Sequence, residues 1–76
     1  MVRAYVMVDA DAGDAAGLLD EVVAVGHVTE AHVVAGGHDI IAEVEAEEVG
    51  EVMSTVATTV RGIDGVADTR TYVCLG

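Results

Sequence analysis

The chain has 76 residues, which is enough for one small domain with a modest core. Its formal net charge is −11, with fourteen acidic residues and three arginines. A surface of this charge repels phosphates and anionic lipids, so the composition excludes direct binding to nucleic acid or to a membrane surface. The acidity, the small apolar residues and the lack of lysine predict adaptation to high salt, where the Debye length is about 3 Å or less.

Cysteine and histidine usage predicts neither a disulfide nor a metal site. Cys74 is the only cysteine, so no internal disulfide and no Cys-x-x-Cys motif can form. The three histidines are too scattered for a metal-ligand motif, and no pattern calls for a cofactor. The sequence also lacks a signal-peptide pattern and any run of about 18 apolar residues, so we expect a cytoplasmic protein.

The first elements are a strand and a helix. Alternating apolar residues predict a strand over residues 2–8, followed by a loop over 9–13. Asp14 is a good N-cap for a helix over 15–25, whose apolar residues recur at helical spacing. Gly26 stands where a helix of that length would place its terminating glycine.

Two apolar runs then meet at a Gly-Gly-His-Asp corner. The runs, at residues 29–35 and 39–45, predict two strands, and the short link makes an antiparallel hairpin the economical connection. We expect this hairpin in the centre of the sheet, with a small polar site at its tip.

The last elements are a second helix and a final strand. Glu47 and Glu48 suit the N-terminus of a helix that ends near Gly62, and the last strand spans residues 66–75. Five apolar side chains predict the buried stripe of this helix. They are Val49, Val52, Met53, Val56 and Val60.

The order β-α-β-β-α-β predicts an α+β domain of ferredoxin-like type. In that fold a four-stranded antiparallel sheet carries both helices on one face. The other face would expose Tyr5, Met7 and Ile41, with no helix to cover them. An apolar patch of this kind is usually an interface, and a second copy packed face to face is the simplest cover.

The central corner has the chemistry of a small binding site. The consecutive glycines Gly36 and Gly37 permit positive φ angles and can turn backbone N–H groups toward a carboxylate. Asp39 could bind an ammonium group, and Thr69 and Thr71 offer hydroxyls. Such a set suits a zwitterionic amino acid. The alternative is an ordinary turn beside ordinary strand threonines.

Two segments carry a family resemblance. Residues 35–41, Ala-Gly-Gly-His-Asp-Ile-Ile, resemble the Gly-x-x-Asp hairpin of the Lrp/AsnC family of transcriptional regulators. Residues 65–73 resemble that family's closing strand, with a Gly-Val start and a Thr-x-Thr pair. The element order and the glycine before the first helix, Gly13, agree, so the resemblance covers essentially the whole chain.

The resemblance implies the effector-binding and oligomerisation module of these regulators, often called the RAM domain. It implies dimers formed through the sheets, octamers or similar rings of dimers, and amino-acid effectors bound at the seams. The effector-binding residues it implies are Gly36, Gly37, His38, Asp39, Thr69 and Thr71.

The chain also departs from the family pattern. It begins directly on the first predicted strand, without the family's helix-turn-helix, so we expect a stand-alone module that influences transcription through partners such as full-length regulators. Ala35 stands where the family often has threonine, which removes one hydroxyl from the corner.

Two other functions fit the same fold. Dimeric ferredoxin-like barrels include small monooxygenases and isomerases, in which His32 or His38 would act as general base, but no second catalytic group is evident. A structural adaptor would keep the interface without the ligand. We expect a non-enzymatic sensor.

Overall fold

The computed structural model describes residues 1–11 and 14–76, so the predicted helix opening at Gly13 lies outside the described residues. The predicted order of elements is confirmed, with close bounds. The elements are β1 (Val2–Ala10), α1 (Ala15–Val23), β2 (Val28–Val33), β3 (Ile40–Ala46), α2 (Val49–Ser54), the π-helical segment η2 (Thr55–Val60) and β4 (Val66–Val73).

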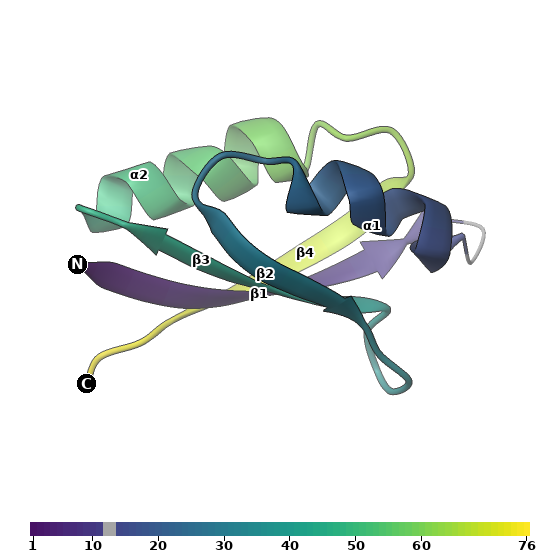
Figure 1. Cartoon of the computed structure of the whole chain (residues 1–76), viewed down its shortest axis with the longest axis horizontal. Helices are drawn as coiled ribbons and strands as arrows, with labels where there is room; N and C mark the ends of the chain where they lie inside the picture. The colour runs from purple at the N-terminus through teal and green to yellow at the C-terminus, as the bar shows by residue number, and fades with distance from the viewer. Residues whose placement is uncertain (12–13) are drawn as a thin grey trace.

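The four strands form one antiparallel sheet in the order β2-β3-β1-β4. Figure 1 shows both helices on the same side of this sheet, as the ferredoxin-like prediction requires. The β2–β3 hairpin is confirmed, but its predicted place in the centre of the sheet is wrong. β2 is an edge strand, because β1 pairs with β3 on one side and with β4 on the other. The hairpin tip therefore lies at a corner of the sheet.

The core lies between the sheet and the helices and contains no aromatic ring. Alternate residues of β1 and β3 supply one layer, and the inner faces of the helices supply the other. The side chains that are at most 1% exposed are Ala4, Val6, Val8, Val22, Ile40, Ala42, Val44, Val52 and Val60. Small branched side chains thus fill the core, as the composition predicts.

The first helix begins as expected but ends differently. The Asp14 carboxylate accepts a hydrogen bond from the Gly17 backbone N–H at 3.2 Å, so the predicted N-cap is confirmed. The expected role of Gly26 as the terminating glycine is wrong. The helix ends at Val23 with Ala24 as its C-cap, and the residue with positive φ is His27, at 73°. This backbone conformation is costly for any residue with a Cβ.

The second helix changes its hydrogen-bond pattern halfway. The Arg61 N–H donates to the Val56 carbonyl at 3.0 Å, which is the five-residue spacing of a π-helix. Val52, Val56 and Val60 are buried as predicted. Val49 and Met53, which precede the π-helical segment, are about half exposed, so that part of the predicted stripe is wrong, and Thr55 is buried as well.

The sheet face away from the helices, called here the open face, is uncovered in the single chain. It carries Tyr5, Met7 and Ile41, as predicted, and both tyrosines lie on it as a cross-strand pair, Tyr5 opposite Tyr72. Their exposed fractions are 37% and 56%. Among the helices of the described residues, none is long and apolar enough to span a membrane.

Candidate functional site

The predicted corner is a loop that is tied to β1 as well as to its own strands. This hairpin loop (residues 34–39) is closed by the Val34 N–H, which donates to the Asp39 carbonyl at 2.9 Å. The Asp39 N–H donates to the Val8 carbonyl at 3.1 Å. The Asp39 Oδ2 accepts from the Ala10 N–H at 2.8 Å. Asp39 therefore anchors the loop to the end of the neighbouring strand.

Ala10 needs such an acceptor because the β1–β3 ladder ends at the pair of Val8 with Ile40, two residues before it. Its N–H, which is directed to the β3 side, has no ladder partner there. The Asp39 carboxylate fills that role, and its other oxygen, Oδ1, has no hydrogen-bond partner among residues 1–11 and 14–76. A carboxylate oxygen without a partner can accept a hydrogen bond from an ammonium group.

His38 forms a second tie between the loop and β1. Its Nδ1 lies 2.8 Å from the Asp9 Oδ1, and the two side chains are 30% and 31% exposed. The two ties, from His38 and Asp39, flank the end of β1 and hold the loop against it.

The two glycines of the loop do not have the conformation that we expected. Within the described residues, the only glycine with positive φ is Gly65, at 103°. An added Cβ at Gly36 or Gly37 would meet nothing within 4 Å. Neither the backbone conformation nor any contact within the chain therefore requires glycine there, and both positions face open space.

The two threonines lie on the other side of the sheet from the open face. Thr69 pairs with Val8 and Thr71 with Val6, and these two valines face the helices and the core. Because Ile40 pairs with Val8 on the opposite side, β1 separates the threonines from the start of β3. Two strand spacings amount to about 10 Å. One chain therefore holds the loop and the threonines at the same end of the sheet but not side by side.

Two hollows of the single chain lie away from these residues. One, of about 510 Å³, is lined by Met1, Arg3, Tyr5, Cys74, Leu75 and Gly76. The other, of about 150 Å³, lies at the start of α1 and is lined by Asp11, Asp14, Gly17, Leu18, Glu21, Asp64 and Gly65. The predicted binding residues line neither hollow.

The other two histidines also lie near carboxylates. The His32 Nε2 is 3.0 Å from the Glu30 Oε1, and the His27 Nε2 is 3.9 Å from the Glu51 Oε2. Within the described part of the chain, no group of three or more His, Cys, Asp or Glu residues could hold a metal ion.

Asp9 and Ala10 are the residues of this region that sequence reasoning missed. They lie 29 positions before their partners in the loop, so no local motif connects them. The predicted topology contained the signal. Since β1 and β3 are antiparallel neighbours in a ferredoxin-like sheet, the end of the first must meet the start of the second.

A family model described as the Lrp/AsnC ligand binding domain matches residues 3–76. A search of curated proteins gives no match. Solved structures of the same fold are numerous. The protein TTHA0845 from Thermus thermophilus is 24% identical with a TM-score of 0.93, and the match covers 100% of this chain and 95% of that one.

Two longer regulators have the same fold over about half of their chains. Escherichia coli AsnC is 20% identical with a TM-score of 0.90, and the match covers 99% of this chain and 51% of AsnC. A transcriptional regulator from Neisseria meningitidis, solved as a complex with L-Met, is 19% identical with a TM-score of 0.86. That match covers 99% of this chain and 50% of the regulator.

Proposed function

The chain belongs to the family of Lrp/AsnC ligand-binding domains, and from this premise we propose that it is a regulatory module that assembles with copies of itself and binds an amino acid at a seam between chains. The effector-binding residues are Gly36, Gly37, His38 and Asp39 of one chain with Thr69 and Thr71. Ligand binding is the property of the family, and the amino acid and the seam are the proposed details.

The observation that carries the proposal is the way in which the hairpin loop is held. Asp39 and His38 tie the loop to β1 at 2.8 Å each, so its shape is set before anything binds. Gly36 and Gly37 nevertheless face open space. Glycine in a held, exposed loop lets a ligand or another chain approach the backbone closely. The backbone N–H groups then bind the carboxylate, and the outer oxygen of Asp39 binds the ammonium group.

The separation of the threonines supports a site made by more than one chain. Thr69 and Thr71 lie across β1 from the loop of their own chain, on the helix side of the sheet. In an assembly, the threonines of a second chain can lie next to the loop of the first chain. This arrangement agrees with the hollows of the single chain, which the predicted residues do not line.

The relatives support the same function. The Neisseria meningitidis regulator of this fold binds L-Met, and we propose an amino acid as the effector here too. The TTHA0845 structure is matched over 95% of its length, so this fold also occurs in a chain of about the same size. On this proposal the module acts in the cytoplasm, binds no nucleic acid itself, and influences transcription through full-length regulators.

A thermal-shift screen tests effector binding. Each of the twenty amino acids is added at millimolar concentration to the protein in concentrated KCl. A ligand that binds only the folded state stabilises it by RT ln(1 + [L]/Kd), about 2.7 kcal/mol at a concentration of 100 Kd. We expect a raised melting temperature with one amino acid or one chemical class of amino acids. A screen in which none of the twenty produces a shift contradicts the proposal and leaves the adaptor function.

Asp39→Asn tests whether the effector needs the negative charge of Asp39. It keeps an oxygen that can accept from the Ala10 N–H but removes the charge. We expect this variant to assemble normally and to lose the thermal shift. Asp20→Asn removes the same charge from the exposed surface of α1 and should respond like the wild type. An unchanged shift in Asp39→Asn would remove Asp39 from the site.

The enzyme hypothesis rests on His32 or His38 as the general base, and of these His38 contacts Asp9 at 2.8 Å. On the proposed function this contact holds the loop and performs no proton transfer. His38→Gln should therefore keep the effector-induced thermal shift in reduced form. Loss of a measurable turnover in that variant, with the binding of substrate retained, would favour the enzyme instead.

A further inference from the structure

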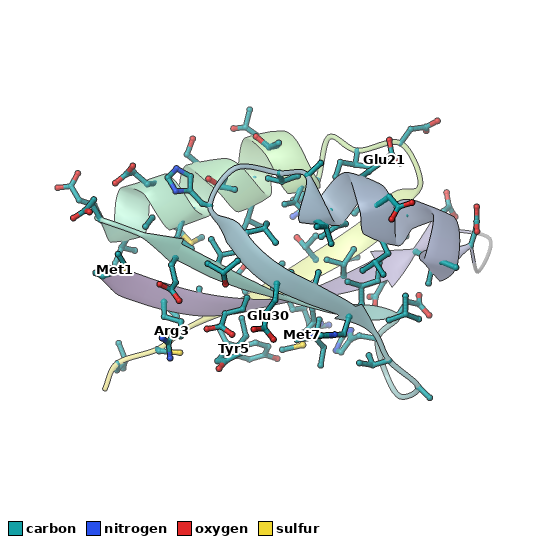
Figure 2. All side chains as sticks on the ribbon, in the orientation of Figure 1. Met1, Arg3, Tyr5, Met7, Glu21 and Glu30 are labelled. Carbon is teal, nitrogen blue, oxygen red and sulfur yellow. The ribbon has the colours of Figure 1, made fainter. Side chains whose placement is uncertain are left out.

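The edge strand β4 has a row of half-buried side chains on the helix side of the sheet. Figure 2 shows Tyr5 and Met7 of β1 pointing away from the helices. Their partners on β4 lie on that same open face, so the residues that alternate with these partners point to the helix side. They are Thr69, Thr71 and Val73. Because β4 is an edge strand, this row has a neighbouring strand on one side only.

The second helix carries an exposed apolar stripe, called here the α2 stripe, which consists of Val49, Met53 and Ala57. Val49 and Met53 are 48% and 47% exposed, and Ala57 is also exposed. Arg61 follows at the same spacing of four residues. An α-helix drifts by about 40° in four residues, and the wider turn of η2 offsets this drift, so the four side chains stay on one flank.

The α2 stripe faces the β4 side of the molecule. Glu51 lies on the flank opposite Met53, because two residues correspond to about 200° around an α-helix. Its carboxylate is 3.9 Å from the Nε2 of His27, which lies in the turn after α1. Arg61, which continues the stripe, lies 3.9 Å from Asp68 of β4, and η2 packs against that strand (Figure 1). The stripe and the row on β4 therefore form two sides of one shelf.

This β4 shelf is uncharged in a strongly acidic chain. The chain has fourteen acidic residues, and none of them belongs to the stripe or to the row on β4. A positively charged side chain placed on the shelf would lose water without gaining a carboxylate. A negatively charged one would meet only Arg61, which already lies near Asp68. An apolar side chain would gain by leaving water.

Two further features of the shelf are typical of binding surfaces. Methionine has a flexible side chain that adapts to different shapes, and it is common where proteins bind varied apolar partners. The six residues of η2 form part of the same wall, and π-helical turns are rare and frequently occur at functional sites. Both features lie beside the threonines of the proposed effector site.

We propose that the β4 shelf binds the side chain of the effector, that this effector is an amino acid with an uncharged apolar side chain, and that Met53 selects it. The inference rests on the proposed function, in which Thr69 and Thr71 of one chain meet the hairpin loop of another. That loop binds the ammonium and carboxylate groups, so the side chain of the amino acid extends from the threonines along the shelf toward Met53. The shelf is open to solvent in the single chain, and the loop of the second chain closes it.

A thermal-shift screen in concentrated KCl tests the class of effector. The twenty amino acids are compared at the same millimolar concentration. We expect a raised melting temperature with one or more of leucine, isoleucine, valine, methionine and phenylalanine, and none with aspartate, glutamate, lysine or arginine. The apolar amino acid with the largest shift is then titrated by calorimetry to obtain its Kd.

Substitution of Met53 tests the selecting residue. Met53→Glu places a carboxylate on the shelf and should raise the Kd of that amino acid by about tenfold or more. Met53→Gln has nearly the same length without a charge and should raise the Kd severalfold, so it carries the test if urea unfolding shows that Met53→Glu does not fold. Thr58→Glu adds the same charge at an exposed position of η2 outside the stripe. This control should leave the Kd within about twofold of the wild type, because concentrated salt screens an exposed charge.

The possible results separate this inference from the proposed function. No shift with any of the twenty amino acids overturns effector binding and this inference with it. A largest shift that comes from a polar or charged amino acid overturns the apolar shelf and leaves the proposed function standing. A Kd for the apolar amino acid that is the same in the wild type and in the folded Met53 variants removes Met53 from the site and overturns the inference.

Discussion

Replacing Asp39 with alanine should destabilise the folded chain through one identifiable hydrogen bond. The Asp39 Oδ2 accepts from the Ala10 N–H at 2.8 Å, in a partly buried position beyond the last β1–β3 pair. The backbone bonds of Asp39 to Val8 and Val34 do not depend on its side chain. Asp39→Ala therefore removes the anchor and leaves the turn otherwise intact.

The expected size follows from what the Ala10 N–H loses. A partly buried donor without its acceptor costs about 1–3 kcal/mol. Asp39→Asn keeps an amide oxygen in place of the carboxylate, so its loss should stay below about 1 kcal/mol, the difference between a charge-assisted and a neutral hydrogen bond. A small domain has a stability of only about 5 kcal/mol, so the alanine variant should be plainly weakened.

Urea unfolding at constant KCl and constant protein concentration measures both changes. Asp20→Ala removes the same charge from an exposed helix position and should change the free energy of unfolding by no more than about 0.5 kcal/mol. The reasoning is refuted if Asp39→Ala unfolds at the same urea midpoint as Asp20→Ala. Equal losses in the alanine and asparagine variants would show that charge matters here and the hydrogen bond does not.

Three further predictions concern the backbone and the solvent. His27→Gly should stabilise the protein by up to about 1 kcal/mol because His27 has a φ of 73°. The control His32→Gly in β2 should destabilise it by about the same amount, and equal losses of stability in urea unfolding would contradict the prediction. Gly65→Ala should lower the free energy of unfolding by at least about 1 kcal/mol because the φ of Gly65 is 103°. Gly36→Ala should leave stability unchanged and weaken the effector-induced thermal shift, and a Gly36→Ala variant with a full shift would remove that residue from the site. The melting temperature should rise with KCl concentration, because salt screens the repulsion of a chain with net charge −11; a flat or falling curve would contradict adaptation to high salt.

The arrangement of the strands and helices could be predicted because the apolar period changes cleanly along the chain. Alternation in β1 and β3 places Val6 and Ala42 on the same buried face, and their cross-strand pairing confirms it. The π-helical segment could not be predicted in this way. Spacings of four and five residues both keep Val52, Val56 and Val60 on one side, and only the hydrogen bonds distinguish them.

The turn in the site region was predictable from the sequence, but its contacts with β1 were not. The Gly-Gly-His-Asp sequence marks a turn, and the turn is there. Local sequence cannot show that the Asp39 carboxylate binds Ala10 or that His38 contacts Asp9, since both contacts form only when β1 and β3 are paired. The left-handed residue at His27 is a similar case. Gly26 is the expected position by propensity, and tertiary structure selects its neighbour.

Sedimentation velocity in concentrated KCl, with and without each amino acid, tests most directly whether this chain is a self-assembling effector-binding module. The account predicts a dimer or a multiple of dimers whose size distribution shifts with one amino acid, and an Asp39→Asn variant that assembles without that shift. A chain that stays monomeric, or an assembly whose size and melting temperature are the same with all twenty amino acids, would contradict it.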